Sequence, residues 1–496
     1  MRTRSVIGVV LLACATACGS TVSGMGVGAA GTSAATGDLG VGAGQDSSTG
    51  PTSTTTSSGF ANSSSDPTQS AASSPIDETS TSAPTGPGVG AGGSAAAGKL
   101  PAASKGVNDT VVKLGFLYLA SAGTVMGGIG VQGYSQGDEL GEITALVADQ
   151  NAHGGLGGRK IQVVKRDLGG IEQSNYQAAC DYFTQDSPVF MVLTSLGHYD
   201  VLNDCLAKRG VGFTSDYLPP FDRLMRKLGP IYAPDDLSGE RTAALVPRAL
   251  IESGLFPKDA KVGIIRQDTP DYERATKNTV RPILEAAGIK VVAEETYSAT
   301  DASGSASAAA AITFRLRGAG VTHVLTFESP LFYMTAAQSQ GWHPFWSVTS
   351  RSGPGAFLVG SAPREQVANS GGPGWQPVSD LATAQQKGFL NPEERRCITT
   401  LAKAGYSYSG TPRYVEQMLC GELYHLVRVV ARSTELSTRA FQVAAEALPS
   451  YPSPVTFSMS FAGGRHDGAS GYRIVRYLTS CSCYQYTTPV RPIPSR

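Results

Sequence analysis

Two glycine-rich patterns near residue 130 carry residue types that could do chemistry. The first, Gly133-Tyr134-Ser135-Gln136-Gly137, places a serine at the spacing of a nucleophile on a sharp strand-to-helix turn. Such a serine needs an acid and then a histidine later in the chain, and Asp380 and His466 could supply that order. The turn also needs a buried strand directly before it, but residues 127–132 are half glycine. We therefore expect Ser135 to be a loop serine.

The second pattern, Gly128-x-Gly130-x-x-Gly133, has the glycine spacing of a dinucleotide-binding turn. That turn should follow the first strand at once, whereas the first apolar run ends near Leu119. The only acidic residue at the end of the next strand, Asp167, lies much too far along the chain. The sequence also contains no P-loop, HExxH or EF-hand pattern, so we expect no cofactor.

Cysteines form the third group of reactive side chains. Six lie beyond the N-terminal region: Cys180, Cys205, Cys397, Cys420, Cys481 and Cys483. A metal site is not expected, because the six histidines are scattered and no Cys-x₂-Cys pair occurs. In an oxidising compartment six thiols allow fifteen pairings.

The order of elements narrows these pairings. Cys180 and Cys205 lie on consecutive predicted helices that flank a strand, and right-handed crossovers place such helices side by side. Cys397 and Cys420 also lie on consecutive helical stretches. We expect each couple to pair, which leaves Cys481 with Cys483 in a tight loop.

A strand, a helix and a second strand position the glycine-rich loop. The apolar run Val112–Leu119 precedes Glu139–Gln150, whose apolar residues recur at helical spacing, and Lys160–Val164 follows a glycine-rich turn. Glycine after the last periodic residue is a usual helix terminator. This βαβ unit predicts a parallel sheet.

The same alternation continues along the chain. Further strands are predicted at Val189–Leu193, Val211–Thr214, Lys261–Ile265, Gly288–Val292 and Thr322–Phe327, with helices at Tyr176–Phe183, Val201–Lys208, Thr242–Ser253, Arg274–Ala287, Ala308–Gly318, Tyr333–Gln340, Pro412–Ala431 and Ser437–Leu448. The expected fold class is α/β, with two doubly wound parallel-sheet lobes. The Gly/Pro-rich segment Gly353–Pro377 fits no simple element.

The N-terminal region predicts export. Residues 1–18 combine Arg2 and Arg4 with a short apolar run, as in a secretion signal. The segment ending at Cys18 is similar to the lipobox of bacterial lipoproteins, and Cys14 fits the same pattern. We favour Cys18 as the lipidated residue. Residues 19–105 are rich in Gly, Ser, Thr, Ala and Pro, which predicts a disordered linker.

Charge excludes one class of partner. The 40 basic and 40 acidic side chains cancel, and nucleic-acid binding requires a basic surface to neutralise phosphates. We expect a monomer held by lipid on the outer face of the cell membrane.

The turn Ala148-Asp149-Gln150-Asn151-Ala152-His153-Gly154-Gly155-Leu156-Gly157-Gly158-Arg159-Lys160-Ile161 identifies a family. It resembles the helix-to-strand signature of type I periplasmic solute-binding proteins, the branched-chain amino-acid-binding family of ABC importers. The likeness covers roughly residues 110–490. In that family the chain crosses three times between two lobes, which implies lobe 1 at 108–230 and 350–450 and lobe 2 at 231–349 and 451–496.

The resemblance also implies a ligand site at the carboxyl ends of the strands, in a hinged cleft. Hydroxyl groups of the first lobe hold a carboxylate in the family, and Ser195 and Thr214 match that role by position, with Ser215 as a further candidate. Tyr272 follows the family's Asp-Tyr pair, and Glu328 lies where an acid could bind an amine.

The implied function is capture of a small polar ligand, such as an amino acid or a related compound, and its delivery to an ABC permease. An enzyme is not expected. A ligand-sensing receptor module on the same fold is the alternative. Third comes a serine esterase using Ser135, because its motif resembles the nucleophile elbow of cutinase-like esterases.

Overall fold

The structure is a computed structural model that describes residues 99–128, 131, 133–217, 219–298 and 304–494. These residues belong to one compact unit of the chain. The predicted signal segment, Cys14, Cys18 and the predicted linker up to residue 98 lie outside the described residues.

The first sheet contains five parallel strands in the order β2-β1-β3-β4-β5. Their bounds are β1 Val111–Tyr118, β2 Lys160–Asp167, β3 Met191–Thr194, β4 Gly212–Thr214 and β5 Ile231–Tyr232. The register pairs Val111 with Lys160 and Leu114 with Met191. The predicted βαβ unit is therefore confirmed, and β1 lies inside the sheet.

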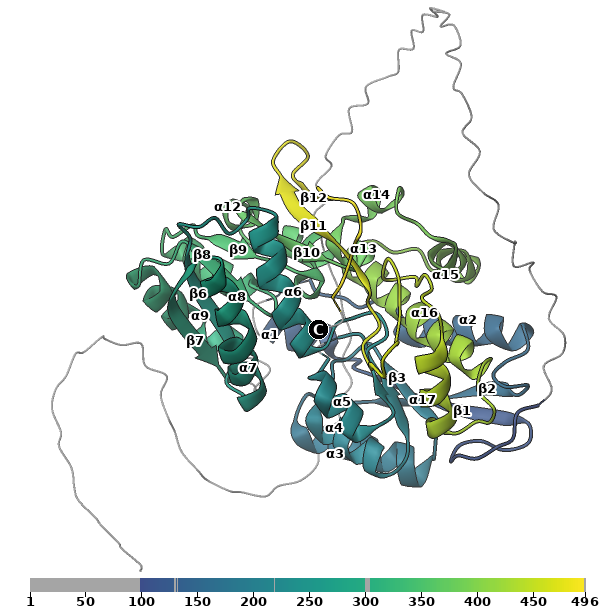
Figure 1. Ribbon diagram of the computed structural model, residues 1–496. Helices are drawn as coiled ribbons and strands as arrows, with labels where there is room; N and C mark the ends of the chain where they lie inside the picture. Colours follow the sequence, from purple (N-terminus) through teal and green to yellow (C-terminus); the bar gives the residue numbers. More distant parts are fainter. Residues whose placement is uncertain (1–98, 129–130, 132, 218, 299–303, 495–496) are drawn as a thin grey trace, which may run out of the picture. The chain divides into compact units, whose positions relative to one another are not determined.

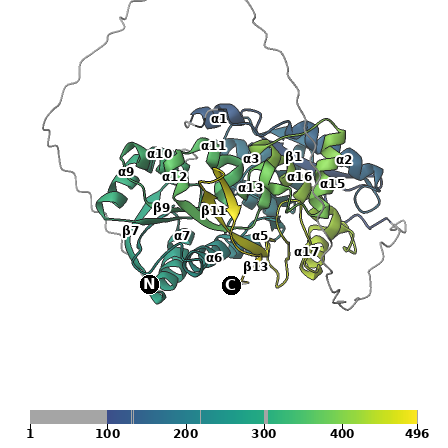
Figure 2. The same cartoon turned by 90° about the horizontal axis from the view of Figure 1, so that it is seen from above.

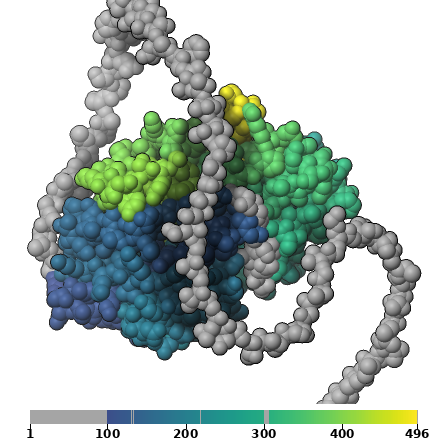
Figure 3. All heavy atoms as spheres, turned by 180° about the vertical axis from the view of Figure 1, so that it is seen from behind, coloured from purple at the N-terminus to yellow at the C-terminus, as the bar shows by residue number. Residues whose placement is uncertain are grey.

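Helices cover both faces of the first sheet (Figure 1). They are α1 Ala122–Gly128, α2 Glu139–Ala152, α3 Gln173–Asp181, α4 Asp200–Lys208, α5 Asp222–Leu228, α15 Pro392–Lys403, α16 Gly410–Val430 and α17 Thr438–Ala447, with the π-helix η1 at Tyr182–Asp186. Alternate β1 residues face opposite ways, so Leu114 packs with α2 and α16 while Leu117 packs with α3 and α4. Both α15 and α16 pack on α2, and Figure 3 shows light-green residues from late in the chain against blue residues from early in the chain.

The second sheet contains eight strands in the order β12-β11-β10-β9-β8-β6-β7, with β13 paired to β11. Their bounds are β6 Lys261–Gln267, β7 Lys290–Tyr297, β8 His323–Thr326, β9 Phe345–Ser347, β10 Ser370–Gly374, β11 Gly471–Leu478, β12 Cys483–Tyr486 and β13 Arg491–Pro492. Strands β6 to β10 are parallel, whereas β11 runs antiparallel to β10, β12 and β13.

Two helical layers enclose this sheet (Figure 2). The helices of this region are α6 Gly239–Glu252, α7 Pro270–Ala275, α8 Arg281–Ala286, α9 Gly304–Gly318, α10 Leu331–Ser339, α11 Val359–Ser361, α12 Arg364–Ala368, α13 Pro377–Asp380 and α14 Thr383–Gln386, with short η2 Thr276–Val280, η3 Ser350–Ser352 and η4 Pro354–Leu358. On β6, Ile264 packs in the core with α6 and α8, and Ile265 packs in the core with α9 and α10.

Three sequence expectations need correction. Residues 350–374 were placed with the first lobe, but Ser370–Gly374 forms β10, which pairs with β9 and β11 of the second sheet. The helix expected at Arg274–Ala287 is present but begins earlier, at Pro270, and it contains the π-helical segment η2 between α7 and α8. The glycine-rich loop expected between Leu119 and Glu139 contains helix α1 near its start.

The end of the predicted linker is ordered. Residues 99–105 were expected to be disordered, but Leu100 packs against the core of the first sheet and its carbonyl accepts from Arg159 Nη1 at 2.6 Å. Ala102 forms a bridge with Leu436. One half-buried apolar side chain and a few hydrogen bonds hold a segment whose composition predicts flexibility. Among the described helices, none is long and apolar enough to cross a membrane.

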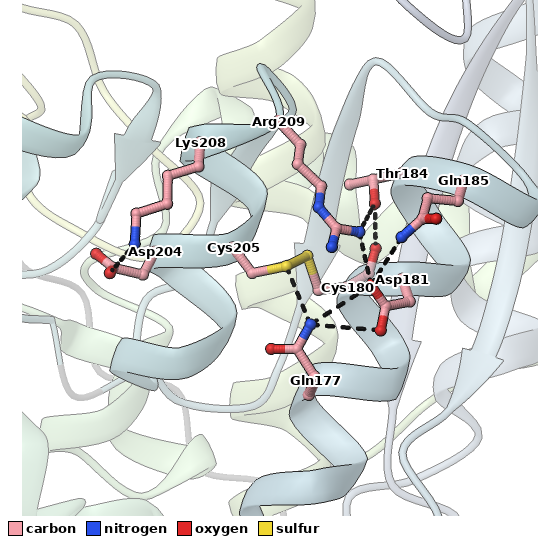
Figure 4. The surroundings of a disulfide bond; sticks show 9 residues. All are labelled: Gln177, Cys180, Asp181, Thr184, Gln185, Asp204, Cys205, Lys208 and Arg209. Atoms are coloured by element: carbon pink, nitrogen blue, oxygen red, sulfur yellow. Dashed lines mark hydrogen bonds and ion pairs between the residues drawn. A yellow bond between two sulfur atoms is a disulfide. The ribbon is translucent and has the colours of Figure 1, made fainter.

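All three expected disulfides are present in the structure: Cys180–Cys205, Cys397–Cys420 and Cys481–Cys483. Cys180–Cys205 joins α3 to α4, and polar side chains surround it (Figure 4). There Gln177 Nε2 donates to Cys205 Sγ at 3.5 Å, and Arg209 Nη1 lies 2.6 Å from Asp181 Oδ1. The order of elements was sufficient to pair these cysteines because consecutive crossover helices pack on one face of the sheet.

Candidate functional site

Polar loops follow the carboxyl ends of strands in both sheets. In the first sheet, β3 ends at Thr194 and β4 at Thr214, and the loops that follow contain Ser195 and Tyr217. In the second sheet, three further loops follow β6, β8 and β9. Parallel strands in one sheet bring such loops to one edge, which is the usual position of ligand sites in open α/β sheets.

Arg351 is fixed by the turn that follows β9. The short helix η3 begins with a capping box, in which the Thr349 side chain accepts from the backbone of Ser352 and the Ser352 side chain accepts from the Thr349 backbone. Gly353 then takes a left-handed conformation, with φ of 58°, and ends the turn. The Arg351 side chain is only 2% exposed. A buried guanidinium of this kind requires acidic partners.

Two acids provide that partnership. Arg351 Nε lies 3.1 Å from Asp236 Oδ2, and its Nη1 lies 3.6 Å from Glu328 Oε1, while Nη2 donates to the Leu237 carbonyl. Burial alone would lower the pKa of Arg351, but the charges of Asp236 and Glu328 raise it. Burial raises the pKa of Asp236 to about 6 against the opposing charge of Arg351. Arg351 thus joins the loops after β8 and β9 to the segment that follows β5.

Glu328 has a second partner in Tyr272. The Tyr272 hydroxyl donates to Glu328 Oε1 at 2.8 Å. The Tyr272 backbone lies in the first turn of α7, where Thr269 caps the helix by accepting from Tyr272 N at 3.4 Å. The rings of Phe221 and Phe327 pack edge-on against Tyr272. The structure therefore brings together Tyr272 and Glu328, both of which the sequence singled out.

The hydroxyl candidates of the first sheet are differently arranged. Ser195 donates to the carboxylate of Glu139, and Ser215 donates to the Leu196 carbonyl. Thr214 Oγ1 is buried without a hydrogen-bond partner among the described residues. The resemblance assigned all three to a carboxylate, but Ser195 and Ser215 give their protons to acceptors of the protein itself.

Tyrosines connect the two halves of the site. Tyr217, in the loop after β4, is 39% exposed as a whole residue. The protein around its hydroxyl nevertheless raises the pKa of that group, mainly through burial and further through the nearby charges of Tyr134 and Glu328. Tyr134 packs edge-on against Phe357, with ring centroids 6.2 Å apart, and it joins hydrophobic clusters of both sheets. Loops from the first sheet therefore approach the acid and guanidinium of the second.

The residues of the serine motif are not assembled for nucleophilic chemistry. Ser135 is exposed and its Oγ accepts from Gly137 N at 3.2 Å. Asp380 accepts from the Tyr486 hydroxyl at 2.5 Å, and His466 Nδ1 contacts the Ile231 carbonyl at 2.9 Å. Asp380 and His466 therefore make their hydrogen bonds with other parts of the fold and not with Ser135. His198, in the loop after β3, contacts the Ser215 carbonyl, and burial lowers its pKa to about 4.

Four important side chains were not assigned from the sequence: Tyr134, Glu139, Asp236 and Arg351. Arg351 lies two residues before the Gly/Pro-rich segment Gly353–Pro377, which had no structural interpretation, and Asp236 lies in a connection between the sheets. Glu139 has the sequence position of an ordinary acid in the first turn of a helix. Only its contact with Ser195, 56 residues away, distinguishes it. Within the described part of the chain, no group of three or more His, Cys, Asp or Glu side chains is arranged to hold a metal ion.

Comparison with known families gives one match. A family described as periplasmic binding protein matches residues 130–480. A search of curated proteins finds no matching sequence.

Several solved structures share the fold. A branched-chain amino-acid ABC transporter protein from Thermus thermophilus with bound valine is 15% identical, with a TM-score of 0.57, covering 78% of this chain and 98% of its own. An ABC transporter substrate-binding protein from Desulfitobacterium hafniense in complex with Leu is 12% identical, with a TM-score of 0.53, covering 76% and 99%. A solute-binding protein from Rhodopseudomonas palustris HaA2 in complex with p-hydroxybenzoic acid is 14% identical, with a TM-score of 0.56, covering 77% and 97%.

Proposed function

Because the chain belongs to the periplasmic binding protein family, whose members are extracytoplasmic, we propose that it captures a small carboxylate-bearing ligand between its two sheets and delivers it to an ABC permease. Leucine, valine and p-hydroxybenzoic acid, the ligands named in the similar structures, all carry a carboxyl group. We therefore propose that the ligand of this chain is an amino acid or a related aromatic acid.

One observation carries this proposal. The Tyr272–Glu328–Arg351 group of the second sheet interacts electrostatically with Tyr217 of a first-sheet loop, and Tyr217 in turn interacts with Tyr134. Arg351 pairs with both Asp236 and Glu328, and burial raises the pKa of Glu328 against the opposing charge of Arg351, so a ligand cation would be a further partner that favours ionised Glu328. The tyrosine rings offer apolar surface and hydroxyl groups for the rest of the ligand. This combination suits a small molecule with one charged end and an apolar body.

Delivery to a permease requires two conformations of different shape. We propose that the two sheets belong to two lobes and that the connections between them act as hinges. Asp235 and Asp236 lie in the first connection, after β5, and Ser453 of the last connection donates to Asp235 Oδ1. A ligand that contacts both lobes would favour the closed form by its differential affinity.

Attachment to a membrane is a separate part of the proposal. We infer that Cys18 carries the lipid and that the chain acts as a monomer beside its permease. Lipidation at a single residue places the site near the membrane without a spanning helix.

A thermal-shift screen tests the ligand class. We expect at least one compound among amino acids and hydroxybenzoic acids to raise the melting temperature of the purified full chain, because a ligand that binds only the native state stabilises it by mass action. A concentration of one hundred times the dissociation constant contributes about 2.7 kcal/mol. Sugars, which lack the carboxylate, serve as the control set. Shifts confined to the sugars would refute the proposed ligand class.

A further inference from the structure

Glu139 lies next to the predicted ligand-binding serine. It is the first residue of α2, directly after the N-cap residue Asp138, and it is only 6% exposed. Its carboxylate accepts the hydroxyl proton of Ser195, the residue that follows β3. Ser195 is also buried, so its hydroxyl has few other partners to choose from.

Acidic and phenolic groups surround Glu139. Glu142 lies on the same helix one turn on, Tyr134 precedes the helix, and Glu422 faces it from α16. Each of these groups responds electrostatically to the Glu139 charge, which raises their pKa values after the larger effect of burial. Burial is the main effect that disfavours the ionised form of Glu139, although the start of a helix normally favours a negative charge.

The direction of the Ser195 hydrogen bond depends on the Glu139 proton. An ionised carboxylate can only accept, so Ser195 must donate to it and presents a lone pair to a ligand. A protonated carboxyl can donate to Ser195 Oγ instead. The Ser195 hydrogen is then free to rotate toward a ligand carboxylate.

We propose that Glu139 is a positioning residue whose protonation turns Ser195 into a donor, so that capture of an anionic ligand group takes up one proton. This inference rests on the proposed function. The proton comes from water and binds a Glu139 carboxylate oxygen, while the Ser195 O–H bond stays intact and only changes its acceptor. Burial supports this assignment, because it raises the pKa of Glu139 to about 7 against the lowering effect of the Ser195 hydrogen bond.

The binding test measures the affinity of L-leucine and of 4-hydroxybenzoate at pH 6 and pH 8. Both carboxylates remain ionised over this range, so a change reports on the protein. We expect the affinity of the wild-type full chain to fall about tenfold at pH 8, because one proton must then be taken up. Calorimetry in two buffers of different ionisation enthalpy should count an uptake of about one proton at pH 8.

Two substitutions distinguish this role from a structural one. Glu139→Gln keeps a group that donates to Ser195 at every pH, so its affinity should not change with pH and it should take up no proton. Glu394→Gln is the matched control, because Glu394 is a buried acid of α15 whose pKa burial also raises to about 7, without contact to Ser195. The control should follow the wild type.

A ligand-free measurement provides a second readout. Folded Glu139 keeps its proton up to about pH 7, whereas unfolded Glu139 releases it near its usual value of 4.5. The wild type should therefore lose stability relative to Glu139→Gln as the pH rises from 5 to 8. Parallel stability curves, or equal wild-type affinity at pH 6 and pH 8, would overturn the inference while leaving the proposed function intact. Failure of both probes to bind at either pH would overturn the ligand class and this inference together.

Discussion

Replacing Arg351 with methionine is expected to lower the free energy of unfolding by about 3–5 kcal/mol. The substitution removes the guanidinium that partners buried Asp236 and Glu328, and it leaves the Leu237 carbonyl without its donor. Methionine has a similar length and creates little empty space, so the loss reports on the unpaired charges. Urea unfolding of the ligand-free protein at pH 7 measures it.

The loss should grow with pH. An acid whose folded pKa is raised binds its proton more tightly in the native state, so it stabilises the fold at low pH and loses that effect as the pH rises through the folded pKa. Burial already raises the pKa of Asp236 to about 6, and removal of Arg351 should raise it further. The difference between wild type and Arg351→Met should therefore be larger at pH 8 than at pH 5.

Arg315→Met is the matched control. Arg315 pairs with Glu295 at the surface, where its side chain is 52% exposed. Loss of an exposed ion pair costs about 0–1 kcal/mol. Equal losses for the two substitutions would mean that Arg351 is not the central charge of the site.

Replacing Glu328 with glutamine is expected to weaken an amine-bearing ligand about ten- to a hundred-fold, which corresponds to about 1.5–3 kcal/mol for a charge-assisted hydrogen bond. Glutamine keeps the shape and can still accept from the Tyr272 hydroxyl, but it carries no charge. L-Leucine should lose affinity, whereas 4-hydroxybenzoate, which has no amine, should bind Glu328→Gln as it binds the wild type. Calorimetric titration of both ligands measures this difference.

Glu365→Gln is the matched control, because it makes the same change from acid to amide at an exposed glutamate. Glu365 lies in α12, where its side chain is 70% exposed and contacts Gln338 and His343. This substitution should leave the affinity for both ligands unchanged. If L-leucine lost no affinity in Glu328→Gln, the assignment of Glu328 to a ligand amine would be wrong, although the fold would be unaffected.

Periodic segments of the fold were predictable from sequence. Val112–Leu119 and Glu139–Gln150 correspond to β1 and α2 because a buried strand and an amphipathic helix each have a regular pattern of apolar residues. β10, with the sequence Ser-Gly-Gly-Pro-Gly, has no such pattern. Its backbone pairs with β9 and β11, and a Cβ on Gly372 would lie 2.2 Å from the Val348 carbonyl oxygen. The close approach of neighbouring backbone segments explains why β10 has glycine here, and strand propensity does not.

The site was predictable only where position along a strand decides it. Thr214 ends β4, Ser195 and Glu328 lie just after β3 and β8, and Tyr272 lies in the first turn of the helix after β6, so strand-end positions together with the family resemblance singled out all four. Ion-pair partners depend on contacts between distant segments, such as Arg351 with Asp236, 115 residues apart. Nothing in the sequence near either residue indicates the other. The contact between Glu139 and Ser195 also joins distant segments, so it could not be predicted from the sequence.

Ligand-induced compaction tests the central claim most directly. We propose that the ligand is held between the two sheets, so binding should bring them together and reduce the radius of gyration. Small-angle scattering of a fragment beginning at Lys99, with and without a ligand identified by the thermal-shift screen, measures this change. The account predicts a smaller radius of gyration with ligand and a reduced effect in Glu328→Gln for an amine-bearing ligand. A ligand that binds tightly while the radius of gyration stays the same would contradict capture between closing lobes.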